Sequence, residues 1–284
     1  KYHGSRAPHD SLLSEKEEDI IARVEYMSEQ MKLGVKAISD AIGIEIKPEH
    51  VASANKKMRA YGFKVGVLTQ LAATADPPVL GGDSVSLAQC IMNVPFNTGT
   101  KYAEEAVDIL TKELRAAIKA GEGVKGTPKV AIRNLPYCIP WLGQMFRQNG
   151  LMVQFACALT QSSRQTQPPT RPDDPWYTAA EAWSRNPMCS NMKNECDSYI
   201  EKLKTYNANG MLLGLFDFDR WVGPQQKLQA KMVEETLHIP CFYIEGDFWD
   251  DREYSPEALK TRVESICQVF KMRLAALEAE KEAE

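Results

Sequence analysis

The sequence predicts an α/β protein, in which a helical amino-terminal section is followed by a parallel sheet with helices on both faces. Apolar residues recur every three or four positions through the first 120 residues, which is the period of amphipathic helices. From Lys129 onward, short β-rich runs alternate with helical patterns, as in parallel sheets covered by helices. The pattern changes in the polar segment 121–126, so we expect two domains, residues 1–125 and 126–284.

The helical section begins with a long amphipathic helix. Ser14 and Glu17 have the spacing of a capping box, and the apolar stripe behind them ends at Gly43. Pro48 suits the first turn of a second helix, which we expect to pack on the first. Methionine and aromatic residues on these stripes are interpreted as core packing. Two further helices are expected around residues 87–91 and 107–118.

The second section carries four candidate strands, residues 130–135, 152–159, 211–216 and 241–244. Helical patterns occur between and after them, around residues 141–148, 189–206, 225–237 and 255–277. This order is typical of a flavodoxin-like or Rossmann-like sheet, which binds ligands outside the carboxyl ends of its strands. The loops that follow the strands are therefore the expected site, residues 134–138, 160–164, 217–220 and 245–247.

Composition narrows the class of protein. The chain has 284 residues, 44% of them hydrophobic, which is enough for a sizeable core. Its net charge of -4 gives no reason to expect nucleic acid, and no apolar run is long enough to span a membrane. No apolar segment precedes Ser14, so no signal peptide is expected, and a start at Lys1 suggests a processed or truncated product. We expect a cytoplasmic protein.

Several familiar sites are excluded. No Gly-x-Gly-x-x-Gly follows Leu135 and no Gly-Lys-Ser/Thr loop occurs, so the usual phosphate-binding loops are missing. None of the four histidines lies at a predicted strand end, which disfavours histidine-based catalysis. The seven cysteines are odd in number and mostly in apolar contexts, so most are expected to be reduced core thiols.

Part of the sequence resembles a known family. The residues of the closing segment are Ile239 to Asp247, Arg252, Tyr254 to Pro256 and Thr261 to Glu264. They resemble the closing strand and helix of the 2-hydroxyacyl-CoA dehydratase and benzoyl-CoA reductase family. Residues 129–133 and 148–153 are similar to that family's second Rossmann-like unit, and Arg164 falls where an arginine after a strand is usual. The resemblance runs from about Val35 to Arg273.

The resemblance implies a subunit of a heteromeric, oxygen-sensitive enzyme that acts on a CoA thioester by one-electron, ketyl-radical chemistry. Such enzymes use a 4Fe-4S cluster, a homologous partner subunit and an ATP-dependent activator protein. The family's amino-terminal cysteine-bearing domain is not evident here, and residues 215–221 contain no cysteine where the family often has one. The cluster is then ligated mainly outside this chain. The alternative is a non-catalytic scaffold or assembly subunit that has lost cluster ligands.

The candidate site residues lie in the strand-end loops. Candidate substrate-binding residues are Pro136, Tyr137, Arg164, Asp217, Phe218, Asp219, Arg220, Glu245 and Asp247. Cys138 is the candidate metal ligand, and its alternative is an inert thiol. Arg164 could bind phosphates or a carboxylate, or be a solvated loop arginine.

Structural alternatives remain open for the acidic candidates. Asp217 and Asp219 could position substrate or a metal-bound water, or pair with Arg220 on the surface. Glu245 and Asp247 could instead cap the next segment or pair with Arg252.

The proline-rich insertion 161–175 is too long for a simple connection, so we expect a subunit contact in preference to a lid. The aromatic residues that follow, Trp176, Tyr177 and Trp183, fit an interface core or a buried anchor for the next helix.

Overall fold

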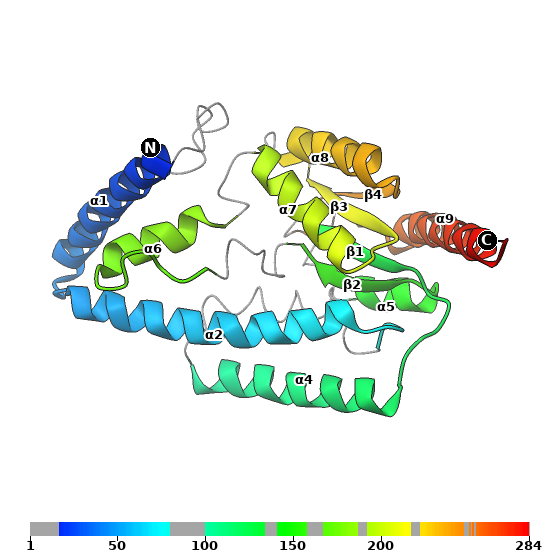
Figure 1. Cartoon of the computed structure of the whole chain (residues 1–284), viewed down its shortest axis with the longest axis horizontal. Coiled ribbons are helices and arrows are strands. Elements are labelled where there is room, and N and C mark those ends of the chain that lie inside the picture. The colour runs from blue at the N-terminus through cyan, green and yellow to red at the C-terminus, as the bar shows by residue number, and fades with distance from the viewer. Residues whose placement is uncertain are drawn as a thin grey trace. The chain divides into compact units, whose positions relative to one another are not determined.

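The computed structural model describes residues 17–79, 100–133, 141–157, 167–186, 192–216, 222–246, 250, 252 and 254–283 (Figure 1). The chain divides into two compact units. The first unit comprises Lys1–Phe63 and Gln161–Ser198, and the second comprises Lys64–Thr160 and Tyr199–Glu284. The boundary that the sequence places between residues 125 and 126 stays a prediction.

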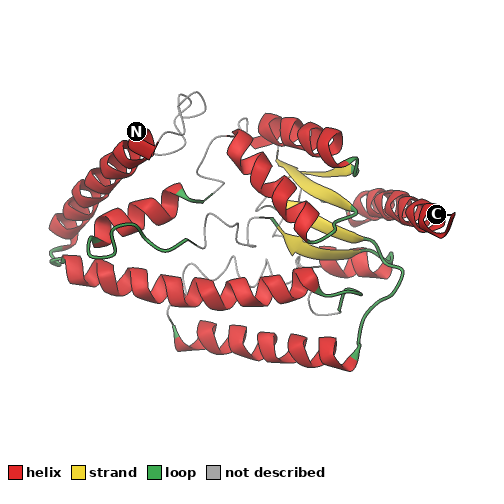
Figure 2. Ribbon diagram, viewed as in Figure 1, coloured by secondary structure: helices red, strands yellow, loops and turns green. Residues whose placement is uncertain are grey.

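The first unit is built on helix α1 (Glu17–Ile42), the first part of α2 (Pro48–Thr74) and helix α6 (Pro175–Ser184) (Figure 2). The expected boundaries are confirmed, since Gly43 follows α1 with a φ of 68° and α2 begins at Pro48. The sequence analysis expects the second helix to pack on the first, and this prediction is wrong. The apolar stripe of α1 packs on α6, which presents Tyr177 and Ala180 to it.

The remaining part of α2 lies beside α4 (Lys101–Ala120) in the second unit. Thr100 caps the start of α4 by accepting from the amide of Ala103, and Gly121 ends it with a φ of 72°. The ammonium of Lys64 bridges the two helices, with Asp108 as its nearer partner at 2.8 Å. The helix expected around residues 87–91 lies outside the described residues.

The apolar stripes of the helices are buried only in part, and Ile38 and Ile42 at the end of the α1 stripe are each 55% exposed. Met27 and Tyr61 belong to the core, as expected. Met58 is 61% exposed, so its interpretation as a core residue is wrong. None of the helices in the described ranges is long and apolar enough to cross a membrane.

A parallel sheet forms the centre of the second unit, as the sequence predicts. Its strands are β1 (Lys129–Arg133), β2 (Met152–Ala156), β3 (Gly210–Phe216) and β4 (Cys241–Gly246). They pair in the order β2-β1-β3-β4, and every pair is parallel. This is the strand order of flavodoxin-like sheets. The four strands occur where the apolar runs predict them, with ends that differ by a few residues.

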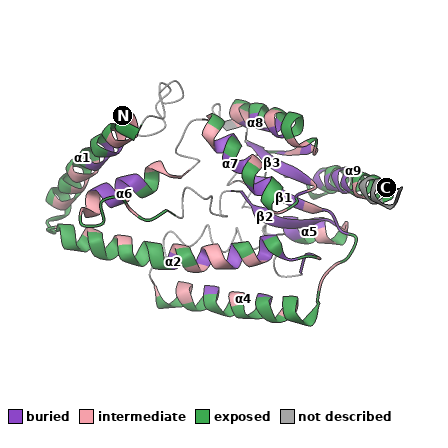
Figure 3. Cartoon of the chain, viewed as in Figure 1, coloured by how far each residue is buried: buried purple, intermediate pink, exposed green. Residues whose placement is uncertain are grey.

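Helices cover both faces of the sheet. On one face, Val130 and Ile132 of β1 pack in a cluster with α5 (Leu142–Gln148) and α9 (Pro256–Ala283). Their strand neighbour Arg133 points to the other face because side chains alternate along a strand. That face is covered by α7 (Met192–Thr205) and α8 (Val222–Leu237). Strands β1, β2 and β3 are correspondingly the most buried elements (Figure 3).

Candidate functional site

The strand order places a switch point between β1 and β3. The chain passes from β1 to β2 on one side of β1, then crosses to the other side to form β3. Connections that leave in opposite directions open a crevice outside the carboxyl ends of the two central strands, where α/β sheets of this kind bind ligands. β1 ends at Arg133 and β3 at Phe216. The predicted site loops 134–138 and 217–220 follow these two ends directly.

Most of the predicted site residues lie outside the described part of the chain. These are Pro136, Tyr137, Cys138, Arg164, Asp217, Phe218, Asp219, Arg220 and Asp247. Their roles stay predictions.

Glu245 is described and lies near the carboxyl end of β4. Its exposed carboxylate accepts from the guanidinium of Arg262 at 3.3 Å. Arg252, the partner expected for Glu245, donates to Asp250 through its Nε at 2.8 Å and through its backbone amide at 3.0 Å. These two hydrogen bonds lower the pKa of Asp250 to about 2.

A fully buried arginine ends the central strand. Arg133 is 1% exposed, and its Nε donates to the hydroxyl of Tyr199 on α7 at 2.8 Å. The guanidinium carbon lies 5.7 Å from the centre of the Tyr199 ring, within cation–π range. Sequence reasoning did not single out Arg133, although an arginine closing an apolar run was a usable signal. The cation is held at the carboxyl edge, directly before the loop 134–138.

A second buried cation lies at the end of the neighbouring strand. Lys202 of α7 is 3% exposed, and its Nζ donates to the carbonyl oxygen of Cys157 at 2.7 Å. Cys157 is the first residue after β2, and its own amide donates to the carbonyl of Ile132. One helix therefore places a cation and a tyrosine against the ends of two adjacent strands.

The described cysteines are core thiols. Cys157, Cys196, Cys241 and Cys267 are all buried and reduced, as expected. Burial raises the pKa of the thiol to about 11 in Cys196 and to about 12 in Cys267. Metal ligation requires thiolates, so these environments oppose it. No group of three histidine, cysteine or acidic residues suited to a metal occurs in the described ranges.

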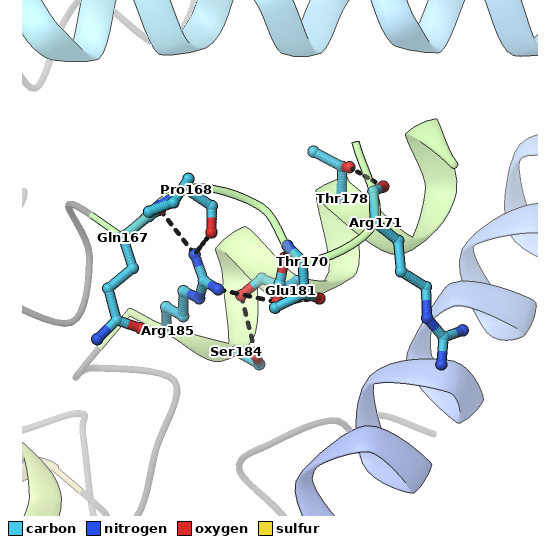
Figure 4. A network of polar contacts seen from close by, with 8 residues as sticks. All are labelled: Gln167, Pro168, Thr170, Arg171, Thr178, Glu181, Ser184 and Arg185. Carbon is cyan, nitrogen blue, oxygen red and sulfur yellow. Dashed lines mark hydrogen bonds and ion pairs between the residues drawn. The ribbon is translucent and has the colours of Figure 1, made fainter. Parts of the chain in front are cut away.

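The first unit contains a separate buried network (Figure 4). The carboxylate of Glu181 on α6 accepts from the hydroxyl and amide of Thr170 and from the guanidinium of Arg185 at 2.8 Å. Arg185 also donates to the carbonyls of Gln167 and Pro168. The network attaches the described end of the proline-rich insertion to α6.

A cavity of about 590 Å³ adjoins this network and is lined by α1, α6 and residues of the same insertion. Arg171 at its edge stacks on the ring of Tyr177 at 4.1 Å and pairs with Glu25 of α1. Tyr177 is buried against α1, whereas Trp183 is 48% exposed. The expected subunit contact stays a prediction.

The sequence analysis did not predict helix α6. Asp174 caps it by accepting from the amides of Trp176 and Tyr177, and Pro175 occupies its first turn. An aspartate followed by a proline is a recognised helix start, so the signal was present.

The fold is that of a doubly wound α/β protein, and its candidate ligand-binding edge lies at the carboxyl ends of β1 and β3. The family model of the 2-hydroxyglutaryl-CoA dehydratase D-component matches residues 8–269, so the chain belongs to this family. The resemblance seen in the sequence is thereby confirmed. The family is a component of a dehydratase of CoA thioesters, which makes the chain an enzyme subunit with a partner subunit. A comparison with curated proteins finds no match.

Proposed function

We propose that the chain is a subunit of an enzyme that acts on a CoA thioester by one-electron chemistry, of the 2-hydroxyacyl-CoA dehydratase or benzoyl-CoA reductase type. The observation that carries the proposal is the family match over residues 8–269. The switch point between β1 and β3 supports it, because α/β sheets of this kind bind their ligands at such a point. The proposed partners are a homologous subunit and an ATP-dependent activator protein.

A 4Fe-4S cluster belongs to this proposal, but the described thiols do not fit it. All four are buried in the core, and burial raises the pKa of the Cys196 and Cys267 thiols. Any cluster ligand from this chain would come from Cys90, Cys138 or Cys189, which lie outside the described residues. Cys138 is the strongest of the three because it follows the carboxyl end of β1. We therefore propose that the cluster is ligated mainly outside this chain.

Iron and acid-labile sulfide, measured on anaerobically purified protein, test this proposal. The chain alone and the complex with its co-purifying subunit are compared, and a Cys138→Ser variant is measured beside them. We expect the complex to contain iron and sulfide and the chain alone to contain little. Cys267→Ser is the matched control, because it removes a core thiol that is not expected to contact a cluster.

The outcomes separate the candidates. A complete cluster on the chain alone contradicts ligation mainly by the partner. If the anaerobic complex contains no iron and no sulfide and does not turn over a CoA thioester, the non-catalytic scaffold is favoured. The burial of the described thiols in the core supports this alternative.

A further inference from the structure

Helix α6 covers only the first part of the apolar stripe of α1. The stripe packs with α6 as far as Met31. A helix rises about 1.5 Å per residue, so the 26 residues of α1 extend about 39 Å and the 10 residues of α6 only about 15 Å. Val35, Ile38 and Ile42 continue the stripe at the same spacing beyond the reach of α6. Ile38 and Ile42 are each 55% exposed, and this end of α1 is largely exposed in Figure 3.

The charged residues of the same stretch point away from the stripe. Lys36 pairs with Asp40 at 2.9 Å on the far side of the helix, and Lys32 pairs with Glu29 at 2.7 Å. The far side is therefore suited to water. The side that carries Ile38 is apolar and uncharged, which is the composition of the core of a protein interface.

The uncovered face also has space for a close neighbour. Gly34 lies one turn before Ile38, and among the described residues nothing lies within 4 Å of the position that its Cβ would take. Glycine inside a helix is less favourable than alanine, and no contact in the described part of the chain requires it here. Ala41 lies one turn after Ile38 and is also small. Another helix can therefore place its side chains in the grooves beside Ile38.

The turn after α1 holds a further apolar residue beside this face. The hydroxyl of Ser39 donates to the carbonyl of Ile44, and it accepts from the amide of Ile46 at 3.2 Å. These two bonds fasten the turn to the last part of α1. Ile44 is 61% exposed, so it extends the apolar face past the end of the helix. A face that is ordered in advance loses less entropy when a partner binds.

We infer that residues 31–46 form part of the interface with the partner subunit and pack against an amphipathic helix of that subunit. The family is a component of a dehydratase, which supplies the partner. Two copies of this face alone would contribute 16 residues a side, whereas stable interfaces use roughly 20–30. A partner subunit that also contacts other surfaces of the chain reaches that size. The inference rests on the partner subunit of the proposed function, and not on one-electron chemistry.

Amide hydrogen exchange locates the contact in the wild type. The full chain alone is compared with its complex with the co-purifying subunit, by mass spectrometry of peptides. We expect exchange in residues 31–46 to slow at least about tenfold on assembly, because the partner covers this part of the helix. Residues 20–27 are the internal control, since α6 already covers their stripe, and they should change by less than about twofold.

Substitutions test the contact independently. Ile38→Glu places a charge in the middle of the face and should weaken the complex at least about thirtyfold, measured by sedimentation velocity over a dilution series. Leu33→Glu is the matched control, because Leu33 is 62% exposed on the same helix and is rotated by about 140° from Ile38. It should weaken the complex by less than about threefold. Gly34→Leu fills the space beside Ile38 and should weaken the complex at least about fivefold, without loss of chain stability in urea.

Each other outcome counts against the inference. Equal exchange of residues 31–46 in the chain alone and in the complex overturns it without any variant. Equal affinities of Ile38→Glu and Leu33→Glu for the partner also overturn it. If the chain alone is a dimer that Ile38→Glu dissociates, a second copy occupies the face and the inference is wrong. A wild-type chain that assembles with no other subunit contradicts the proposed function itself, and the inference falls with it.

Discussion

The hydrogen bond between Tyr199 and Arg133 makes a quantitative prediction. Tyr199→Phe removes the hydroxyl that accepts from the buried Nε at 2.8 Å, but keeps the ring 5.7 Å from the guanidinium carbon. The substitution leaves no sizeable cavity, so its cost is the loss of a hydrogen bond to a buried charge. Such bonds contribute about 1.5–3 kcal/mol. We expect the free energy of unfolding of the second unit to fall by about this amount.

Equilibrium unfolding in urea measures this change, and amide exchange in β1 assigns it to the second unit. Tyr102→Phe is the matched control, because Tyr102 is 83% exposed and the same change there should alter stability by less than about 0.5 kcal/mol. Tyr199→Leu should cost more than Tyr199→Phe, since it also removes the ring. The reasoning is refuted if Tyr199→Phe and Tyr102→Phe unfold at the same urea concentration and show equal exchange in β1.

Three further predictions concern other parts of the chain. Arg185→Met should destabilise the first unit by about 3–5 kcal/mol, measured by amide exchange in α6, because it leaves the carboxylate of Glu181 buried without this partner. Gly210→Ala should cost at least about 1–3 kcal/mol in urea unfolding, since its Cβ would lie 1.9 Å from the ring of Phe270. Iodoacetamide should label Cys267 at pH 8 far more slowly in the folded than in the unfolded chain, by mass spectrometry, because burial raises its pKa from 9.0 to about 12.

The raised pKa of Cys267 also predicts how the free energy of unfolding changes with pH. Between pH 9 and 12 the Cys267 thiol ionises in the unfolded chain but stays protonated in the folded one. The unfolded state then binds fewer protons, so the free energy of unfolding should decrease as the pH rises through this range. Cys267→Ala should remove this contribution, and an unchanged slope of stability against pH in the variant would contradict the assignment.

Element types and many boundaries were predictable from the sequence. The helices and strands of the second unit occur where apolar periodicity places them, because the spacing of side chains along a helix or strand is a local property. Gly43 and Gly121 mark helix ends, because a glycine accepts a positive φ at low cost, and this too is a local property. The family resemblance also depended only on sequence order.

The candidate site was predictable as an edge of the sheet, but not as a set of contacts. Strand alternation implied parallel pairing, and parallel pairing gathers the carboxyl ends at one edge. The bond between Arg133 and Tyr199 joins residues 66 positions apart, and nothing in their local sequence pairs them.

The sequence by itself determined the secondary structure, the parallel sheet and the family, because each depends on residue order and local spacing. Only the tertiary structure decided that α1 packs on α6, that β1 lies between β2 and β3, and that Arg133 and Lys202 are buried. These features depend on which faces meet after the chain folds. Many pairings bury similar apolar area, and the choice among them is made by the packing of the whole unit.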